Sequence, residues 1–512
     1  MNANKRSLVV SIAANLVSVV VSLGISFLLT PYLIDTAGKE AYSFFPLANN
    51  FVSYMSIITL ALNSMASRFI TISLVQKDVD KAHRYFSSVF FSNVLLSAIL
   101  LLPCLVITVF IDHFLNIPTE LVGDVRMLFG LVFASMIVNL IFSVYDVSTF
   151  ATNRMDLRGG KDILQNVLRA ALLILLYRFC AASVVYLGIA ALFTMLFNGV
   201  MQYFFTRKLL PDYRVRLAEF DKTAVKEILS SGVWNSINSI GSILLQSVSL
   251  LIANIMIGAA EAADLSIVQT LSNLMTTVIC AIYGVLLSRI SLVYAQGNTD
   301  ATVEEVRFSQ KILGLISTTP GVLIIIFGKA FYSLWVPDID AGYLQILSIA
   351  NIIPVLIHSS MWTVYGLNVT NNKLKQPALV LILTGAVSAV LSMILIQLFD
   401  MGILALPVAS AVCNVLFYVV YLPAYAAKEM GVRPFTFYPH MGRSLVFCAV
   451  MILLLYPLVD RLAIGSWVAF FGYGAVAGCI GLVLYVLICF TKKDRTQLLD
   501  GFRSRLKGKD PA

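Results

Sequence analysis

The sequence predicts an all-α, polytopic membrane protein with about 14 transmembrane helices, and three observations predict it. The composition is 59% hydrophobic and 12% charged over 512 residues, whereas soluble proteins average about 45–50% and about 25%. Apolar stretches of about 20 residues or more, the length that crosses a bilayer, recur along the chain. Lysine and arginine collect in alternate connections between these stretches. Such a chain leaves no room for a separate soluble enzyme domain, and we expect no enzymatic activity.

The apolar stretches begin close to the N-terminus. Lys5 and Arg6 precede a first stretch that is longer than the apolar core of a signal peptide and has no cleavage pattern after it, so we interpret it as an uncleaved span. The expected spans are 8–34, 42–74, 86–111, 127–150, 163–182, 184–206, 228–257, 265–295, 311–335, 343–368, 377–398, 402–427, 443–459 and 464–491.

The distribution of basic residues gives the orientation. Cytoplasmic loops of membrane proteins carry an excess of Lys and Arg, and an arrangement with both termini inside places 31 of the 36 basic residues on the cytoplasmic side. That count assigns all basic residues from Arg154 to Arg169 to one cytoplasmic loop. One missing span would invert every later loop, so fourteen spans with cytoplasmic termini are predicted. The net charge of +9 then describes a face that meets anionic membrane lipids, and no nucleic-acid partner is expected.

The two halves of the chain resemble each other. Span 8–34 aligns with span 228–257 at an offset of 224, which pairs polar residues four times, and the Ser-Arg pair at 67–68 matches the one at 288–289. Both halves start on the same side of the membrane with six spans each, so the repeat is parallel, as in several secondary transporters. We expect an N-terminal lobe (1–210), a cytoplasmic linker (211–227), a C-terminal lobe (228–428), two additional spans (443–491) and a basic cytoplasmic tail (492–512).

Polar residues line one face of the first span of each half. The two stripes consist of Ser11, Asn15, Ser18, Ser22 and Ser26, and of Asn235, Ser239, Ser242, Gln246 and Ser249. Asn50 and Asn273 occupy equivalent positions in the spans that follow. Because hydrocarbon excludes such a face, each stripe either packs against another helix, where Ser is a common contact residue, or lines a central aqueous cavity. Asn and Gln at equivalent positions favour the cavity.

Arg68 and Arg289 are equivalent in the repeat and lie about two turns inside the cytoplasmic ends of spans 42–74 and 265–295. Two interpretations are open. A guanidinium binds phosphate bidentately and stays charged at any relevant pH, so the pair is suited to binding a pyrophosphate. Alternatively, each arginine anchors its span at the cytoplasmic interface.

Two further ionisable residues lie within the predicted spans. Asp146 is a candidate for coupling transport to an H⁺ or Na⁺ gradient, although a role as local partner of Arg154 or Arg68 fits it better. His358, close to Trp362, is a second candidate for ion coupling, and a packing role fits it better. The seven cysteines form no CxxC pair and no HExxH motif occurs, so neither a metal nor a cofactor is expected. Without a Walker A motif, energy has to come from an ion gradient, the membrane potential or the substrate gradient.

The two six-span lobes, the polar first helix of each lobe, the SRF and SRI ends of spans 42–74 and 265–295 and the two C-terminal spans resemble the polysaccharide transporter branch of the MOP (multidrug/oligosaccharidyl-lipid/polysaccharide) superfamily. The Wzx-type flippases belong to this branch. The resemblance covers nearly the whole chain and implies a MATE-like fold. It implies a flippase that moves undecaprenyl-pyrophosphate-linked oligosaccharide across the bacterial inner membrane for O-antigen (lipopolysaccharide), capsule or exopolysaccharide synthesis. A polysaccharide polymerase and a chain-length regulator are the partners it implies.

Two other branches of the superfamily are alternatives. Drug-extruding MATE transporters generally have twelve spans and functional carboxylates in the N-terminal lobe, whereas Asp35 and Glu40 fall at the outer edge of the membrane here. Lipid II flippases share the fourteen-span plan and a cationic cavity, of which this sequence displays two repeat-equivalent arginines. A sugar polymerase or ligase would carry a large outer loop, and the outer loops of this chain are about fifteen residues or fewer.

Overall fold

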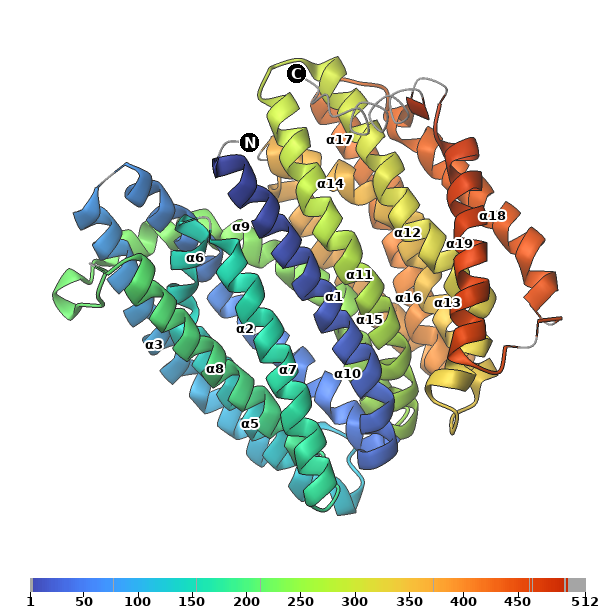
Figure 1. Ribbon diagram of the computed structural model, residues 1–512, viewed down its shortest axis with the longest axis horizontal. Coiled ribbons are helices and arrows are strands. Elements are labelled where there is room, and N and C mark those ends of the chain that lie inside the picture. Colours follow the sequence, from blue (N-terminus) through green and yellow to red (C-terminus); the bar gives the residue numbers. More distant parts are fainter. Residues whose placement is uncertain are drawn as a thin grey trace. The chain divides into compact units, whose positions relative to one another are not determined.

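The structure is a computed structural model that describes residues 3–495 apart from 77, 153, 212, 372, 460, 463, 492 and 493; the side chains of 3–16, 19, 20, 75, 155, 235 and 434 are outside the description as well. Every regular element within these residues is helical (Figure 1). Contacts divide the chain into two compact units, Met1–Ser266 and Ile267–Ala512. The predicted lobe boundaries concern the sequence repeat and remain a prediction.

The first unit begins with α1 and ends within α11. Its elements are α1 (Ala3–Ala37), α2 (Lys39–Val75), α3 (Val79–Val109), α4 (Ile111–Phe114), η1 (Thr119–Leu121), α5 (Val122–Phe142), η2 (Ser143–Asp146), α6 (Val147–Ala151), α7 (Met155–Phe179), α8 (Val185–Leu209), η3 (Leu217–Glu219), α9 (Lys222–Gln246), α10 (Val248–Met256) and the start of α11 (Ala259–Tyr294).

Long helices stand side by side in the first unit. Contacts join α3 to α5, α5 to α8, α8 to α7 and α7 to α1, and α2 packs against α3, α5 and α9 (Figure 1). Glycines on α8 let α5 approach closely: a Cβ added at Gly188 would lie 2.9 Å from the Leu131 side chain, and one at Gly199 would lie 2.6 Å from the ring of Phe142. Small residues take this role in membrane bundles because helix association there depends on close packing.

The second unit contains the remaining elements. They are the rest of α11, then α12 (Thr299–Trp335), α13 (Ala341–His358), η4 (Ser359–Met361), α14 (Trp362–Thr370), α15 (Lys375–Phe399), η5 (Gly402–Leu404), α16 (Ala405–Asn414), the π-helix η6 (Val415–Tyr421), α17 (Leu422–Met430), η7 (Pro434–Phe437), α18 (Tyr438–Val459) and α19 (Trp467–Cys489).

Helix α12 forms the centre of the second unit. It contacts α13, α14, α18 and α19, and 61% of its most apolar window is buried. The Lys311 ammonium pairs with the Asp494 carboxylate at 2.6 Å, and the Tyr485 hydroxyl donates to the Lys311 carbonyl. Burial opposes ionisation of Asp494, but hydrogen bonds from Lys311 and Thr491 hold the pKa of its carboxyl below the usual range. The two additional C-terminal spans are therefore fastened to α12 at the end that carries the tail.

Each of the fourteen predicted spans coincides with a helix or with a run of consecutive helical elements. Twelve of these, within the described residues, are long and apolar enough to cross a membrane. The other two are α1, which contributes the apolar segment Val21–Ala37, and α7, a continuous helix of 25 residues that contains several charges. The predicted all-α polytopic fold is confirmed, with twelve clear spans plus these two helices.

Two spans are interrupted by short 3₁₀ segments, η2 between α5 and α6 and η4 between α13 and α14. Neighbouring helices supply hydrogen bonds at both interruptions. The Thr206 hydroxyl of α8 donates to the Tyr145 carbonyl at 3.0 Å, and the Ser359 hydroxyl donates to the Ser317 hydroxyl of α12 at 2.6 Å. Irregular backbone is tolerated at membrane depth where protein covers it.

Candidate functional site

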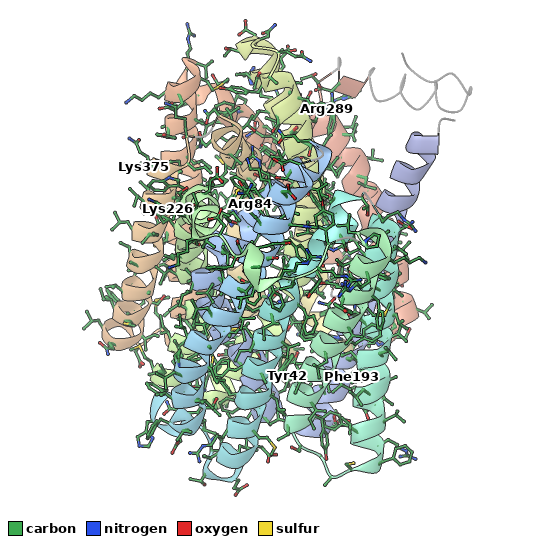
Figure 2. The ribbon with its side chains drawn as sticks, turned by 90° about the vertical axis from the view of Figure 1, so that its left-hand side faces the viewer. Tyr42, Arg84, Phe193, Lys226, Arg289 and Lys375 are labelled. Atoms are coloured by element: carbon green, nitrogen blue, oxygen red, sulfur yellow. The ribbon has the colours of Figure 1, made fainter. Side chains whose placement is uncertain are left out.

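The two repeat-equivalent arginines differ in their surroundings. Arg68, on α2, is exposed and has no hydrogen-bond or ion-pair partner among the residues that the structure describes. Arg289, on α11 (Figure 2), is also exposed. Its Nε lies 2.7 Å from a carboxylate oxygen of Glu305, and its guanidinium lies 5.5 Å from the centre of the Phe308 ring. Arg68 is thus free to bind an anion, whereas an anion at Arg289 has to compete with a carboxylate.

The structure describes some of the side chains in the two polar stripes. The side chains of Ser11, Asn15 and Asn235 lie outside it. Ser18 is buried, Ser22, Ser26, Ser239, Ser242 and Ser249 are half-buried, and Gln246 and Asn273 are exposed. The Ser242 hydroxyl donates to the Asn238 carbonyl of its own helix, and the Asn50 amide donates to the Ser247 carbonyl at 3.2 Å. The assignment of both stripes to a cavity remains a prediction.

Helices α2 and α9 touch backbone to backbone. A Cβ added at Gly232 would lie 1.8 Å from the Ala61 carbonyl oxygen, so no other residue fits there without moving a helix. One turn further on, the Ser236 hydroxyl donates to the Ile57 carbonyl at 3.1 Å. This contact accounts for the grouping of α9 with the first unit, although the sequence repeat groups it with the second half.

Polar contacts connect the predicted outer ends of α2 and α3 with the segment formed by α10 and the start of α11. Asn116 donates from its backbone N–H to the Asn254 carboxamide oxygen and from its own carboxamide to the carbonyls of Asn254 and Ile255, each at 2.9 Å. The Lys39 ammonium lies 2.7 Å from the Asp264 carboxylate. Because Asn254 is fully buried, the bond that its carboxamide oxygen accepts is shielded from competition with water.

Asp146 belongs to a chain of polar groups between η2, α7 and α8. The Gln202 carboxamide donates to the Asp146 carboxylate and, at 3.1 Å, to the Asn198 carboxamide oxygen, which also accepts a bond from Lys161. Lys161 is only 5% exposed and lies 3.4 Å from the Asp162 carboxylate. The two carboxylates and two amides thus form a polar network that compensates the positive charge of the buried Lys161 ammonium.

The sequence did not indicate this network. Of the two arginines considered as partners of Asp146, Arg154 instead pairs with Asp156 at 2.9 Å. The available signal was the spacing of Asn198 and Gln202, four residues apart in an apolar span, which places both on one face of α8. Of the described residues, no group of three or more His, Cys, Asp or Glu could hold a metal ion.

His358 lies inside the second unit. It is 6% exposed, and its ring stacks on Tyr418, with a centroid distance of 4.7 Å, and on Trp362, at 6.1 Å. Its Nδ1 is buried without a hydrogen-bond partner in the described structure. The described contacts of the His358 ring are aromatic stacking, and its assignment to packing or to ion coupling remains a prediction.

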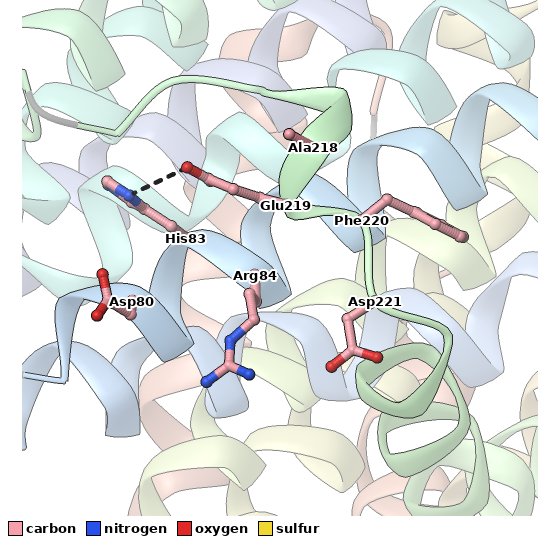
Figure 3. A pocket seen from close by; sticks show the side chains of 7 residues that line it. All are labelled: Asp80, His83, Arg84, Ala218, Glu219, Phe220 and Asp221. Atoms are coloured by element: carbon pink, nitrogen blue, oxygen red, sulfur yellow. Dashed lines mark ion pairs between the residues drawn. The ribbon is translucent and has the colours of Figure 1, made fainter.

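A pocket of about 270 Å³ lies where the segment after α8 folds back onto α3. Asp80, His83 and Arg84 of α3 form one side, and residues 218–221 form the other (Figure 3). His83 pairs with Glu219 at 3.8 Å, and the backbone N–H of Asp221 donates to the Ser88 hydroxyl. The predicted cytoplasmic linker is therefore a docked segment with defined contacts.

The comparisons with known proteins agree with this architecture. A model of the family described as polysaccharide biosynthesis protein matches residues 8–292, more than half of the chain. The chain is 26% identical to the uncharacterized membrane protein EpsK of Bacillus subtilis (strain 168) over 505 residues, which cover 96% of this chain and 98% of that protein.

Solved structures are similar in fold. The lipid II flippase MurJ in an inward closed conformation matches with a TM-score of 0.68 at 11% identity, over 93% of this chain and 98% of MurJ. An inward-facing multidrug resistance MATE family transporter of the MOP superfamily matches with a TM-score of 0.62 at 16% identity, over 81% of this chain and 94% of its own. Since the family match extends over more than half of the sequence, the chain belongs to the polysaccharide biosynthesis protein family, and its fold is similar to that of MATE and MurJ proteins.

Proposed function

We propose that the protein is a flippase that moves undecaprenyl-pyrophosphate-linked oligosaccharide units from the cytoplasmic to the outer leaflet of a bacterial inner membrane by alternating access. The product would enter O-antigen, capsule or exopolysaccharide synthesis, and both termini would lie in the cytoplasm. One observation carries the proposal: a sequence of the polysaccharide biosynthesis family adopts a fold that matches a lipid flippase over 93% of its length.

The chemistry of the arginines supports this substrate. The exposed Arg68 guanidinium, without a partner in the described structure, offers its donors to an oxyanion at the predicted cytoplasmic end of α2. Arg289 would exchange its bond with Glu305 for a bond to a phosphate, which makes its site the weaker one. A pyrophosphate would therefore engage Arg68 first.

The drug-antiporter alternative depends on a titrating carboxylate in the first unit. The best-placed carboxylate, Asp146, already has Gln202 as a donor and Lys161 as a nearby opposite charge. Asp146 is therefore part of a polar network, and the drug sensitivity of a deletion strain tests the antiporter alternative.

Deletion of the gene in its native host tests the function. A flippase predicts that lipid-linked oligosaccharide accumulates on the inner leaflet and that surface polysaccharide disappears, both reversed by the wild-type gene. Accumulation of nucleoside or peptidoglycan precursors with normal surface polysaccharide would instead indicate the lipid II alternative. Unchanged polysaccharide together with increased drug sensitivity would contradict the proposal.

Complementation with arginine variants tests the site. Arg68→Ala should reduce polysaccharide export more than Arg68→Lys, because Lys keeps the charge but loses the bidentate geometry. Arg289→Ala should cost less than Arg68→Ala, and the double variant should be non-additive if one ligand contacts both residues. Arg433→Ala, an exposed arginine outside the repeat equivalence, is the matched control. Full export from all variants at normal protein level would make both arginines interfacial anchors.

A further inference from the structure

Helix α7 carries a face of polar and charged residues inside the first unit. Lys161, Gln165 and Arg169 follow at intervals of four, so they lie on one side of the helix. Arg169 is 14 residues after Met155 and 10 before Phe179, which places it ~21 Å from one end of α7 and ~15 Å from the other. This position is well within the span, although the sequence alone grouped Arg169 with a cytoplasmic loop.

The depth of Arg169 also follows from its neighbours. Its guanidinium carbon lies 5.5 Å from the centre of the Phe45 ring of α2, and Tyr42 is close enough to interact with it electrostatically. Figure 2 shows Tyr42 toward one end of the first unit and Arg84 and Lys226 toward the other. Arg169 therefore lies nearer to the end of the unit that contains Tyr42 than to the end that contains Arg84 and Lys226.

The charge of Arg169 is not compensated by the residues that the structure describes. Its Nε is buried without a hydrogen-bond partner, and the described part of the chain gives it no ion pair. Lys161 on the same helix, by contrast, has Asn198 and Asp162 as partners. An aromatic ring face attracts a cation, but it provides no acceptor for the buried Nε–H of Arg169. Intramembrane charges of this kind mark ligand sites and pathways.

We propose that Arg169 is the cationic centre of an anion-binding site inside the first unit, separate from the Arg68 and Arg289 positions, and that its ligand is an oxyanion. With Phe45 against its face, the guanidinium keeps its edge donors, which match the two oxygens of a carboxylate or phosphate. Two groups of the substrate have this chemistry, a carboxylate on the sugar and the pyrophosphate of the carrier. This choice of ligand rests on the proposed function, whereas the existence of an anion site does not.

The site belongs to one half of the chain. The repeat pairs α7 with α15, and α15 contains no charged residue after Lys375 at its first position. The second half of the chain therefore has no anion site equivalent to the one at Arg169. One anion per protein is expected at Arg169, and binding there makes the two halves of the transporter unequal.

Calorimetric titration of the purified full-length protein in detergent tests the site. The probes are inorganic pyrophosphate and glucuronate, and the proteins are wild type, Arg169→Gln and Arg178→Gln. Arg178 is an exposed arginine at the outer end of the same helix and serves as the matched control. We expect one of the probes to bind wild type and the Arg178→Gln protein equally and the Arg169→Gln protein at least tenfold more weakly. The probe that shows this loss identifies the source of the oxyanion.

Two results would overturn the site: no binding of either probe to wild type at 10 mM, or binding to Arg169→Gln within twofold of wild type. If Arg169→Gln does not fold, Arg169→Lys replaces it, because it keeps the charge but loses the paired donors, and its affinity should lie at least threefold below wild type. Equal affinity of a folded Arg169→Lys would also count against the guanidinium site.

Transport in proteoliposomes separates this proposal from the proposed function. If wild-type protein binds a probe through Arg169 but moves no lipid-linked oligosaccharide, the anion-site proposal stands and the proposed flippase function is wrong. If wild-type protein moves a lipid-linked oligosaccharide and Arg169→Gln equals it in both binding and transport, the proposed flippase function stands and the anion-site proposal is wrong.

Discussion

Replacement of Gly232 by alanine tests the packing of α9 on α2. The added Cβ would lie 1.8 Å from the Ala61 carbonyl oxygen, and real contacts of this kind do not fall below 3.0 Å, so the helices have to separate by at least 1.2 Å, the difference of the two distances. The Ser236–Ile57 bond, now 3.1 Å long, would then stretch beyond hydrogen-bonding range. Overpacking costs about 1–3 kcal/mol and a lost hydrogen bond about 1 kcal/mol.

The sum predicts that Gly232→Ala destabilises the protein by about 2–4 kcal/mol, which should lower its melting temperature in detergent by at least about 2 °C. Gly284→Ala is the matched control, since this helical glycine of α11 has no atom within 4 Å of an added Cβ. Alanine there should leave stability unchanged or raise it by up to about 1 kcal/mol. Melting is followed by size-exclusion chromatography after heating. A Gly232→Ala protein that melts at or above the wild-type temperature would refute the backbone contact between α2 and α9.

Three further predictions concern two contacts elsewhere in the fold and the membrane topology. Asn254→Ala should lower stability by about 1–3 kcal/mol in the same melting assay, because the backbone N–H of Asn116 loses its acceptor, the fully buried Asn254 carboxamide; an unchanged melting temperature would show that water replaces it. Asp494→Asn removes a charged hydrogen bond worth roughly 1.5–3 kcal/mol and should speed proteolytic removal of the tail, whereas an unchanged rate would mean that the ion pair does not hold it. A reporter that is active only outside the cytoplasm should work when fused near Asp338 and stay silent near Lys373, and the reverse pattern would invert the topology.

The sequence predicted the helices well and their charged contacts poorly. Apolar length is a local property, so every predicted span coincides with a helix. α7 is the instructive case: its hydropathy is lowered by Lys161 and Arg169, and the position of each charge relative to the bilayer depends on which helices surround it. The hydrogen bond of Asp146 to Gln202 joins residues 56 positions apart, and no local pattern indicates such a partner.

The residues of the predicted pyrophosphate site show the same limit. Sequence alignment of the halves made Arg68 and Arg289 equivalent, but it contained no information about the side chains facing them. Glu305 pairs with Arg289, whereas Arg68 has no ion-pair partner in the described structure. Equivalent backbone positions therefore carry unequal electrostatics, because the repeat constrains helix packing more strongly than surface charge.

The 3₁₀ interruptions η2 and η4 have a consequence for amide exchange. Bonds in a 3₁₀ segment have poorer geometry than those of an α-helix, so the spans that contain Tyr145 and Ser359 have their weakest backbone bonds near these residues. Amides of the following turns should exchange with deuterium sooner than those of α5 and α13, even though both segments are buried. The two helices of each span would then open independently, and the side-chain bonds from Thr206 to the Tyr145 carbonyl and from Ser359 to Ser317 would set how long each 3₁₀ segment stays closed.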